Sequence, residues 1–233
     1  MLQGGNGHEF CENHLRLTNF LELQDHRALA AGMMGPLLFR DFKIYREYLT
    51  LSEQKALVEE LRVAAADTPP FQPVLRSGKR MSVRITSFGA RGWLPDQTGY
   101  QYAAQHPNGT PWPPIPTSVL KIWQAVSEVD RLPDSCLMNF YGEDTKMGMH
   151  QDRDEAGFDW PVVSVSLGDE ALFRMGNTTR GGKTESIWLR SGDVVVMGGA
   201  ARLAYHGIDR IRFGSSTLLK KGGRLNLTLR VAG

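Results

Sequence analysis

Two residues of types that bind metals stand two positions apart near the middle of the chain. His150 and Asp152 lie in a run with few helix signals, and residues i and i+2 of a β-strand point to the same face. A strand here would let the imidazole and the carboxylate hold one metal ion between them. His206, in the sequence Tyr-His-Gly, is the candidate third ligand. Two neutral nitrogens and one carboxylate that leave one side open are the ligand set of non-haem Fe(II) oxygenases.

A second group of polar side chains alternates with leucines close to the end of the chain. Arg224, Asn226, Thr228 and Arg230 are separated by three leucines, so one face of a strand would be apolar and the other polar. One interpretation is a half-buried strand with a solvated polar face. The other is a site for a small dicarboxylate, because a guanidinium binds a carboxylate in a two-pronged geometry. Beside an Fe(II) site, that dicarboxylate suggests 2-oxoglutarate.

Length and composition indicate an ordinary soluble protein of one domain. The chain has 233 residues, of which 41% are hydrophobic and 22% charged, so it can bury a substantial core. Its net charge of +2 neither requires nor excludes a nucleic-acid partner. No apolar run approaches the roughly 20 residues that cross a bilayer, and the first residues lack a secretory pattern. Cys11 and Cys136 are the only cysteines, which favours a reducing cytoplasm.

Hydrophobic patterns in the first half of the chain predict supporting helices. Residues 1–35 are poorly patterned, and we interpret them as a flexible extension. A short strand is expected over residues 37–45. A capping box at Thr50 predicts the start of a helix that ends before Pro69, and a second helix is expected from about residue 116.

The second half of the chain has the pattern of short strands separated by glycine-rich turns. Strands are expected there over residues 137–141, 161–167, 171–175, 186–189, 194–197, 203–206 and 224–231, and one more is expected earlier, between the helices, over residues 80–86. Seven or eight strands at this spacing predict a jelly roll or a similar two-sheet barrel. The expected fold class is therefore α+β, mainly β.

With these motifs identified, the chain resembles the AlkB family of Fe(II)- and 2-oxoglutarate-dependent dioxygenases, close to its bacterial DNA-repair branch. The similar segments keep the family's order over roughly residues 37–232; they include residues 139–141, 150–154, 205–207 and the final Arg-x-Asn-x-Thr-x-Arg motif. The resemblance implies a double-stranded β-helix (jelly-roll) core in a dioxygenase domain over residues 36–233. It also implies a nucleotide-recognition lid over about residues 75–116.

The same resemblance implies roles for individual residues. Iron would be held by His150, Asp152 and His206. The residues implied for 2-oxoglutarate are Asn139, Tyr141, Arg224, Asn226 and Arg230, with Arg224 on the distal carboxylate. The residues implied for the substrate are Trp93, Tyr100, Gln101, Tyr102, Asp154 and Arg180, with the target base between Trp93 and His206.

The implied reaction is oxidative demethylation of N-alkylated bases, which reverses DNA alkylation damage directly. It consumes 2-oxoglutarate and O₂ and releases formaldehyde, succinate and CO₂. The implied substrates are 1-methyladenine and 3-methylcytosine in DNA, chiefly single-stranded, with duplex DNA and RNA as further candidates. Both lesions are cationic, which suits the indole of Trp93 and the carboxylate of Asp154. A cytoplasmic monomer that needs no membrane is expected.

Two alternatives are open at this point. A related 2-oxoglutarate dioxygenase could act on methyl groups of tRNA, protein or lipid; the aromatic residues Trp93 and Tyr100 favour a base without deciding between RNA and DNA. A jelly-roll binding module without catalysis is the other alternative. An incomplete triad would support it, whereas the sequence contains all three expected ligands.

Overall fold

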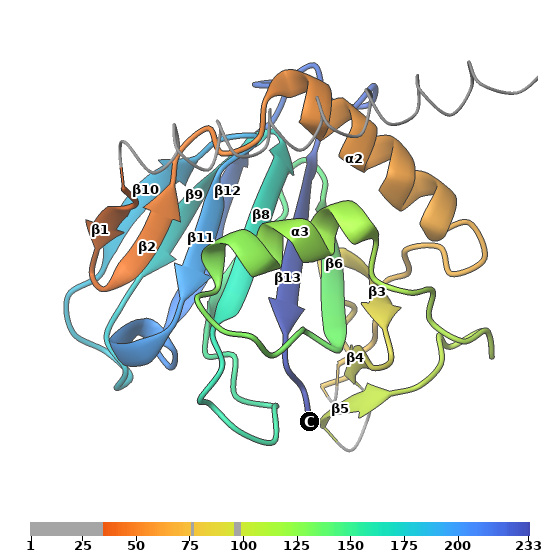
Figure 1. The fold of residues 1–233 in the computed structure, drawn as a ribbon, viewed down its shortest axis with the longest axis horizontal. Helices are drawn as coiled ribbons and strands as arrows, with labels where there is room; N and C mark the ends of the chain where they lie inside the picture. The colour runs from red at the N-terminus through yellow and green to blue at the C-terminus, as the bar shows by residue number, and fades with distance from the viewer. Residues whose placement is uncertain (1–34, 76, 96–98) are drawn as a thin grey trace, which may run out of the picture. The chain divides into compact units, whose positions relative to one another are not determined.

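Strands make up most of the regular structure in the computed structural model, which describes residues 35–75, 77–95 and 99–233 (Figure 1). The extension predicted over residues 1–35 lies outside the described residues, apart from Gly35. In the described part of the chain, the first element begins at Leu37.

Seven strands form a large sheet. They are β1 (Leu37–Phe39), β2 (Phe42–Tyr45), β3 (Arg84–Gly89), β6 (Ser135–Tyr141), β8 (Val162–Gly168), β11 (Val194–Met197) and β13 (Arg224–Arg230). Their order across the sheet is β1-β2-β11-β8-β13-β6-β3, and each neighbouring pair is antiparallel. The strand with the alternating polar residues, β13, is therefore an interior strand between β8 and β6.

Four further strands form a small antiparallel sheet, and two more form a separate hairpin. The small sheet consists of β7 (Met147–His150), β9 (Glu170–Met175), β10 (Glu185–Leu189) and β12 (His206–Arg212), in the order β10-β9-β12-β7. The hairpin consists of β4 (Gly92–Pro95) and β5 (Tyr100–Ala103). It lies within the segment predicted to be a lid.

Two α-helices occur in the described part of the chain, close to where the sequence predicts them. Helix α2 (Leu51–Ala64) begins with the predicted capping box: the Thr50 hydroxyl accepts from the backbone N–H of Glu53, and the Glu53 carboxylate accepts from that of Thr50. Helix α3 (Thr117–Val126) follows a proline N-cap. Neither these nor any other described helix is long and apolar enough to cross a membrane.

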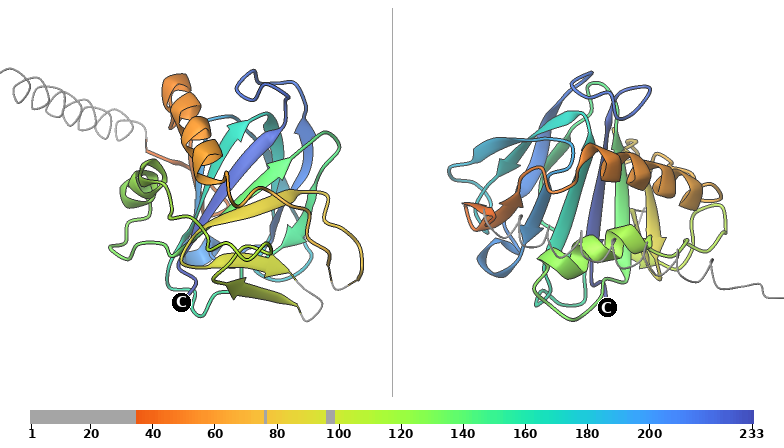
Figure 2. Two further views of the ribbon diagram at one scale, coloured as in Figure 1. Left: turned by 90° about the vertical axis from the view of Figure 1, so that its right-hand side faces the viewer. Right: turned by 45° about the horizontal axis from the view of Figure 1, so that its top comes forward.

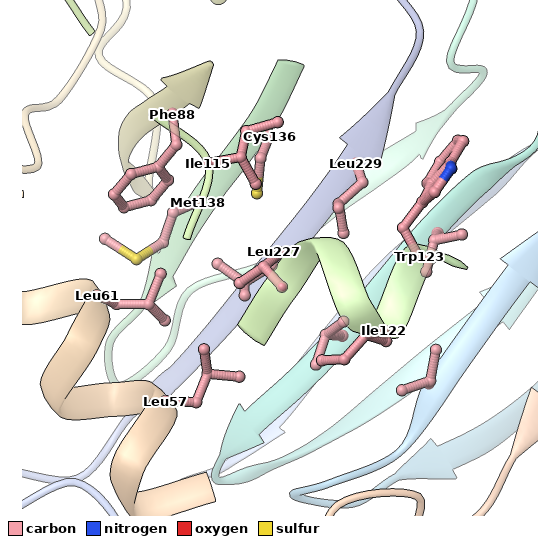
Figure 3. Packing of buried hydrophobic residues seen from close by; sticks show 14 of the residues in the cluster. Leu57, Leu61, Phe88, Ile115, Ile122, Trp123, Cys136, Met138, Leu227 and Leu229 are labelled. Atoms are coloured by element: carbon pink, nitrogen blue, oxygen red, sulfur yellow. The ribbon is translucent and has the colours of Figure 1, made fainter. Parts of the chain in front are cut away.

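Both helices cover the outer face of the large sheet (Figures 1 and 2). Trp123 of α3 and Leu61 of α2 are almost completely buried, and they belong to the same cluster as Leu227 and Leu229 of β13 (Figure 3). The leucine face of β13 is thus the face under the helices. Because side chains alternate along a strand, its polar face must point the other way, toward the small sheet.

A second apolar cluster joins the two sheets. It includes Phe42 and Ile44 from the large sheet and Phe173 and Met175 from the small sheet, and each of them is buried. Two antiparallel sheets packed face to face, with helices on the outside of the larger one, confirm the predicted α+β, mainly β jelly roll.

Three of the predicted strands differ from the structure. The short strand predicted over residues 37–45 is a pair of antiparallel strands, β1 and β2, joined by a turn at residues 40–41. Residues 203–206 do not form a strand, because a 3-10 helix (η1, Gly199–Ala201) continues in a turn closed by a hydrogen bond from the Ala204 N–H to the Ala201 carbonyl. Strand β12 begins at His206, where that prediction ends. The strand predicted over residues 80–86 begins later, as β3 at Arg84.

We expect Cys136, which is packed under the helices, to be unreactive in the folded protein. Its side chain is fully buried, and burial raises the pKa of the thiol to about 12, so almost no thiolate exists at pH 8. We expect iodoacetamide to leave Cys136 unmodified in the folded protein and to alkylate it in urea, as measured by peptide mass spectrometry. Equal alkylation in both conditions would contradict the described packing.

Candidate metal centre and its surroundings

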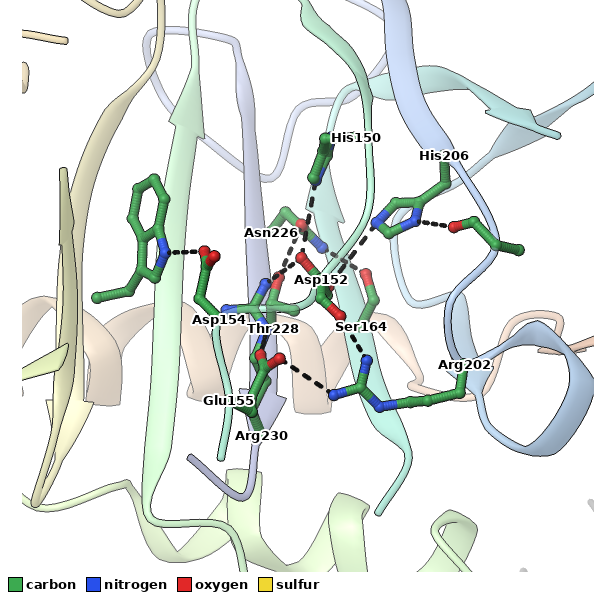
Figure 4. A network of polar contacts seen from close by, with 12 residues as sticks. His150, Asp152, Asp154, Glu155, Ser164, Arg202, His206, Asn226, Thr228 and Arg230 are labelled. Carbon is green, nitrogen blue, oxygen red and sulfur yellow. Dashed lines mark hydrogen bonds and ion pairs between the residues drawn. The ribbon is translucent and has the colours of Figure 1, made fainter. Parts of the chain in front are cut away.

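A cross-strand pair of the small sheet brings the two predicted histidine ligands together. His206, the first residue of β12, is the register partner of His150, the last residue of β7. Their ring centroids are 4.6 Å apart. Asp152 lies just beyond the end of β7, so the two neighbouring ligands do not share one strand as expected. The loop after β7 instead turns the carboxylate toward the imidazoles (Figure 4).

The three side chains have the geometry of a metal site. His150 Nε2 lies 3.8 Å from Asp152 Oδ1, and His206 Nε2 lies 3.8 Å from Asp152 Oδ2. One ligand atom from each residue lies within 4.8 Å of the others, and no other such group of three or more occurs among the described residues. The structure therefore brings together the three residues that the sequence singles out.

Hydrogen bonds from the opposite ring nitrogens orient both imidazoles. Nδ1 of His150 lies 2.8 Å from the Gly148 carbonyl, and Nδ1 of His206 lies 3.0 Å from the Ala204 carbonyl. A carbonyl only accepts, so each Nδ1 carries the proton and each Nε2 presents a lone pair. Burial lowers the pKa of His206 to about 4, which keeps this imidazole neutral and able to bind a metal at neutral pH.

The Asp152 carboxylate is ionised, and one of its oxygens is available to bind a cation. Burial alone would raise the pKa of this carboxyl, but the Arg230 guanidinium and the two imidazoles outweigh burial and hold the pKa well below its usual range. Arg230 Nη2 donates to Oδ1 at 2.8 Å. Oδ2 is buried and has no hydrogen-bond partner in the described structure. An unpaired buried anionic oxygen costs free energy, and a metal ion between the imidazoles would satisfy it.

The polar face of β13 is buried next to this cluster and is not solvated. Arg224, Asn226, Thr228 and Arg230 are each at most 8% exposed, so the interpretation of a solvated strand face is wrong. In the register with β6, Asn226 is paired with Asn139 and Arg224 with Tyr141. The five residues expected to bind 2-oxoglutarate therefore lie on two adjacent strands.

Arg224 carries the clearest sign of a missing anionic partner. Its guanidinium carbon lies 5.2 Å from the centroid of the Tyr141 ring, and Nη2 donates to the Ser166 hydroxyl at 3.0 Å. Its Nε and Nη1 are buried without hydrogen-bond partners among the described residues. Burial lowers the pKa of Arg224, and the nearby Tyr141 and Asp193 offset this only in part. A carboxylate is the ligand that the two free N–H groups fit.

The neighbouring amide and phenol extend this site toward the metal cluster. Asn139 Oδ1 is buried and unpaired in the described structure. Asn226 Nδ2 is already bonded to the Ser164 hydroxyl at 2.7 Å, and its Oδ1 accepts from Thr228. Burial raises the pKa of Tyr141, so its hydroxyl is a neutral donor. The free N–H groups of Arg224 and the Tyr141 hydroxyl are thus the donors here that fit a small dicarboxylate.

The hairpin predicted to be part of the substrate lid stands beside the loop that carries Asp152. Trp93 of β4 stacks on Tyr100 of β5, with ring centroids 5.1 Å apart and an interplanar angle of 18°. The indole N–H of Trp93 donates to Asp154 Oδ2 at 2.9 Å. Tyr100 is 58% exposed. Gln101 is also exposed, and both residues are thus accessible to a substrate.

Tyr102 and Arg180 are placed differently from the other predicted substrate residues. The Tyr102 hydroxyl donates inward to Glu155 at 3.1 Å. Arg180 is exposed in the loop between β9 and β10. This loop contacts the metal loop, because Gln151 Nε2 donates to the Thr178 carbonyl at 3.0 Å. Arg180 is thus an exposed residue of a loop that contacts the metal loop through Thr178.

Two buried charged residues beside the metal cluster were not predicted from the sequence. Arg202 is 5% exposed and donates to the backbone carbonyl of Asp152 at 2.6 Å. Glu155 is 7% exposed and pairs with both Arg202 and Arg230. Glu155 ends a run of charged residues in which Arg153 and Asp154 are exposed, so only the fold distinguishes it from these neighbours.

The chain is similar over most of its length to known dioxygenases. The model of the 2OG-Fe(II) oxygenase superfamily matches residues 41–230. The "Alpha-ketoglutarate-dependent dioxygenase AlkB homolog" of Caulobacter vibrioides is 48% identical over 82% of this chain and 87% of its own length; α-ketoglutarate is another name for 2-oxoglutarate.

Two more distant matches are described as ALKBH1 proteins. The "DNA N(6)-methyladenine demethylase ALKBH1C" of Arabidopsis thaliana is 30% identical over 91% of this chain and 53% of its own length. A solved structure of OsALKBH1 has a TM-score of 0.69 and 30% identity, covering 83% of this chain and 99% of that one. With its His-Asp-His cluster, this chain belongs to the AlkB family of the 2OG-Fe(II) oxygenase superfamily and is an Fe(II)- and 2-oxoglutarate-dependent dioxygenase.

Proposed function

We propose that this protein removes methyl groups from N-alkylated nucleic-acid bases, chiefly 1-methyladenine and 3-methylcytosine in single-stranded DNA. The observation that carries the proposal is the hairpin beside the metal cluster. A stacked aromatic pair, half-buried Trp93 and exposed Tyr100, is hydrogen-bonded through Trp93 to Asp154, two residues from Asp152. The relatives described as AlkB and as a DNA demethylase support a nucleic-acid substrate.

His150, Asp152 and His206 would hold the iron through the two Nε2 atoms and Asp152 Oδ2. Bound Fe(II), together with 2-oxoglutarate and O₂, supplies the oxidation that hydroxylates the methyl carbon and leaves succinate and CO₂. The protein's own contribution is to present neutral imidazoles and an ionised carboxylate on one side only, which leaves the other side for ligands.

The five residues on β6 and β13 would bind and orient 2-oxoglutarate. Arg224 would receive the distal carboxylate through its unpaired Nε and Nη1. Tyr141 and Asn139 lie on β6, beside β13. Arg230 would bind the end of 2-oxoglutarate nearer the metal, because it contacts Asp152. Asn226 would act by holding Ser164 and Thr228 in place.

The substrate base would be held over the metal by rings and by charge. We assign the two sides of the base to Trp93 and His206, and its positive charge to Asp154. An indole face attracts a cationic ring, and a methylated base that cannot pair is cheaper to extrude or is already unstacked in a single strand. Tyr100 and Gln101 would contact the flanking backbone, and Arg180 the rim of the pocket.

Residues 36–233 would form the dioxygenase domain, with the lid over about residues 75–116. The match of the family model to residues 41–230 supports this boundary. We further propose a cytoplasmic enzyme that acts as a monomer.

Asp154→Asn is expected to lower demethylation of cationic bases selectively. Asparagine still accepts the Trp93 N–H, so the indole keeps its place, but the stabilising charge is lost. Loss of about 1 kcal/mol corresponds to roughly a fivefold lower kcat/KM for 3-methylcytosine. The neutral lesion 1-methylguanine, in the same oligonucleotide, serves as the control. Equal loss on both bases would contradict the charge role of Asp154.

A panel of substrates tests the proposed function. Matched oligonucleotides that carry 3-methylcytosine as single-stranded DNA, duplex DNA or RNA would be compared with methylated tRNA and a methyl-lysine peptide, with loss of the methyl group followed by mass spectrometry. We expect the fastest loss from single-stranded DNA. Demethylation confined to tRNA or to the peptide would overturn the substrate assignment while leaving the dioxygenase assignment intact.

A further inference from the structure

We propose that Glu155 is a positioning residue that links the β4–β5 hairpin to the metal ligand Asp152. The hairpin is the element that would hold the substrate, and Asp152 would hold the iron, so the inference rests on the proposed function of these two parts. The described ion pairs and hydrogen bonds of Glu155 go to Arg202, Arg230 and Tyr102, and not to the three metal ligands. It acts through Arg230, Arg202 and Tyr102.

The Glu155 carboxylate is buried and has three partners: the hydrogen-bond donors Tyr102 and Arg202, and an ion pair with Arg230. Its side chain is 1% exposed. Oε1 lies 3.1 Å from Arg230 Nε and accepts from the Tyr102 hydroxyl at 3.1 Å, while Oε2 accepts from Arg202 Nη2 at 3.2 Å. A carboxylate this deeply buried is stable only if its charge is compensated, and here two guanidiniums compensate it.

Both guanidiniums continue from Glu155 to Asp152. Arg230 Nη2 donates to the side chain of Asp152 at 2.8 Å, and Arg202 Nη1 donates to its backbone carbonyl at 2.6 Å (Figure 4). The side chain and the main chain of the metal ligand are thus each held by an arginine that Glu155 holds in turn. This arrangement fixes Oδ1 of Asp152 against Arg230 and leaves Oδ2 facing His206.

We expect the negative charge of Glu155 to affect metal affinity directly. Two guanidiniums lie close to a site that must accept a divalent cation, and the carboxylates of Asp152 and Glu155 neutralise them. Without the negative charge of Glu155, the positive field on the metal increases. The Arg230 guanidinium, released at Nε, would also be free to turn onto both oxygens of Asp152 and compete with the metal.

The hairpin is attached to the metal loop at two neighbouring residues. Trp93 and Tyr102 are cross-strand partners in the hairpin. Trp93 donates to Asp154 and Tyr102 donates to Glu155. The outer attachment is exposed and lies where the base would bind, whereas the inner one leads through Arg230 to Asp152. A displacement of the hairpin therefore reaches the metal ligand through Tyr102 and Glu155.

The test measures Co(II) binding by calorimetry in the absence of nucleic acid, for Glu155→Gln, Tyr102→Phe and the double variant. Partners of metal ligands typically change metal affinity 10- to 100-fold, so we expect Glu155→Gln to raise the Kd for Co(II) by about that factor. Tyr102→Phe removes one hydrogen bond and is expected to raise it about three- to tenfold. The double variant should match Glu155→Gln alone, because Tyr102 acts only through Glu155.

Two controls separate positioning from general damage. Glu143→Gln makes the same chemical change at an exposed loop residue, and Tyr48→Phe removes a hydroxyl on the helix-covered side of the large sheet; both should bind Co(II) as the wild type does. The visible spectrum of bound Co(II) reports ligand geometry, and we expect it to change in Glu155→Gln but not in the controls. Tyr102→Phe lies in the separate hairpin and keeps the test usable if Glu155→Gln fails to fold.

Different results would contradict the role of Glu155 and the proposed substrate. Wild-type Co(II) affinity and spectrum in Glu155→Gln, or additive losses in the double variant, would overturn the link whatever the substrate is. If the network behaves as expected but no methylated base is demethylated, the positioning role is supported and the substrate assignment fails.

Discussion

His206→Ala is expected to remove iron binding and to lower conversion of 2-oxoglutarate to succinate by at least about 100-fold. Replacing residues that merely support a metal ligand costs 10- to 100-fold, and this variant deletes one of three ligands. The loss is direct because His206 Nε2 faces the unpaired Oδ2 of Asp152, 3.8 Å away. Bound iron and succinate, measured on the same preparation, report the two effects separately.

The matched control is the other buried histidine of the described structure. His106 is 6% exposed and hydrogen-bonds to the Pro69 carbonyl, away from the metal cluster. His106→Ala is expected to lower the unfolding temperature while the purified protein still binds iron. Iron at wild-type stoichiometry in His206→Ala would contradict the assignment of the ligands.

Arg224→Met is expected to weaken 2-oxoglutarate binding by roughly 30-fold or more. Truncating one partner of a buried, hydrogen-bonded charge pair costs about 2–5 kcal/mol, and each 1.4 kcal/mol is about a factor of ten in Kd. Methionine keeps most of the volume, so the sheet should still pack. Calorimetry with 2-oxoglutarate on the Co(II)-loaded protein measures the change.

Arg224→Lys sharpens this prediction, because it retains the charge and loses the planar fork. A guanidinium meets a carboxylate with two parallel hydrogen bonds, whereas an ammonium is a point charge. We expect lysine to restore only part of the affinity. Arg212→Met, at an arginine 54% exposed on the small sheet, is the control and should bind 2-oxoglutarate normally. Unchanged affinity in Arg224→Met would place the distal carboxylate elsewhere.

The alternation of β13 shows how much of the site the sequence contains. Period-two patterning predicts that Arg224, Asn226 and Arg230 share a face, and this holds. Which face is buried is a tertiary fact, since it depends on β8 and β6 on either side and on helices over the leucines. The residue types favoured a binding site over a solvated face, because two arginines on one face suit an anionic ligand.

Other parts of the site could not be predicted from local patterns. Glu155 and Arg202 are 47 positions apart, and neither stands in a periodic segment. The hydroxyl of Tyr102 turns inward, whereas Tyr100, two residues earlier, is exposed. Residues 203–205 are a short apolar run, which occurs in strands and in compact turns alike, so the predicted strand was wrong. Long-range polar contacts and turn geometry are decided by the assembled fold.

Counting two products in one reaction tests most directly whether this dioxygenase demethylates nucleic-acid bases. Single-stranded DNA with one 3-methylcytosine would be incubated in air with the protein, Fe(II) and 2-oxoglutarate, beside His150→Ala. Lost methyl groups are counted by mass spectrometry and succinate by chromatography. We predict about one succinate for each methyl group removed by the wild type and neither product from the variant. An unchanged methylated base, with folded and iron-loaded wild-type protein, would contradict the account.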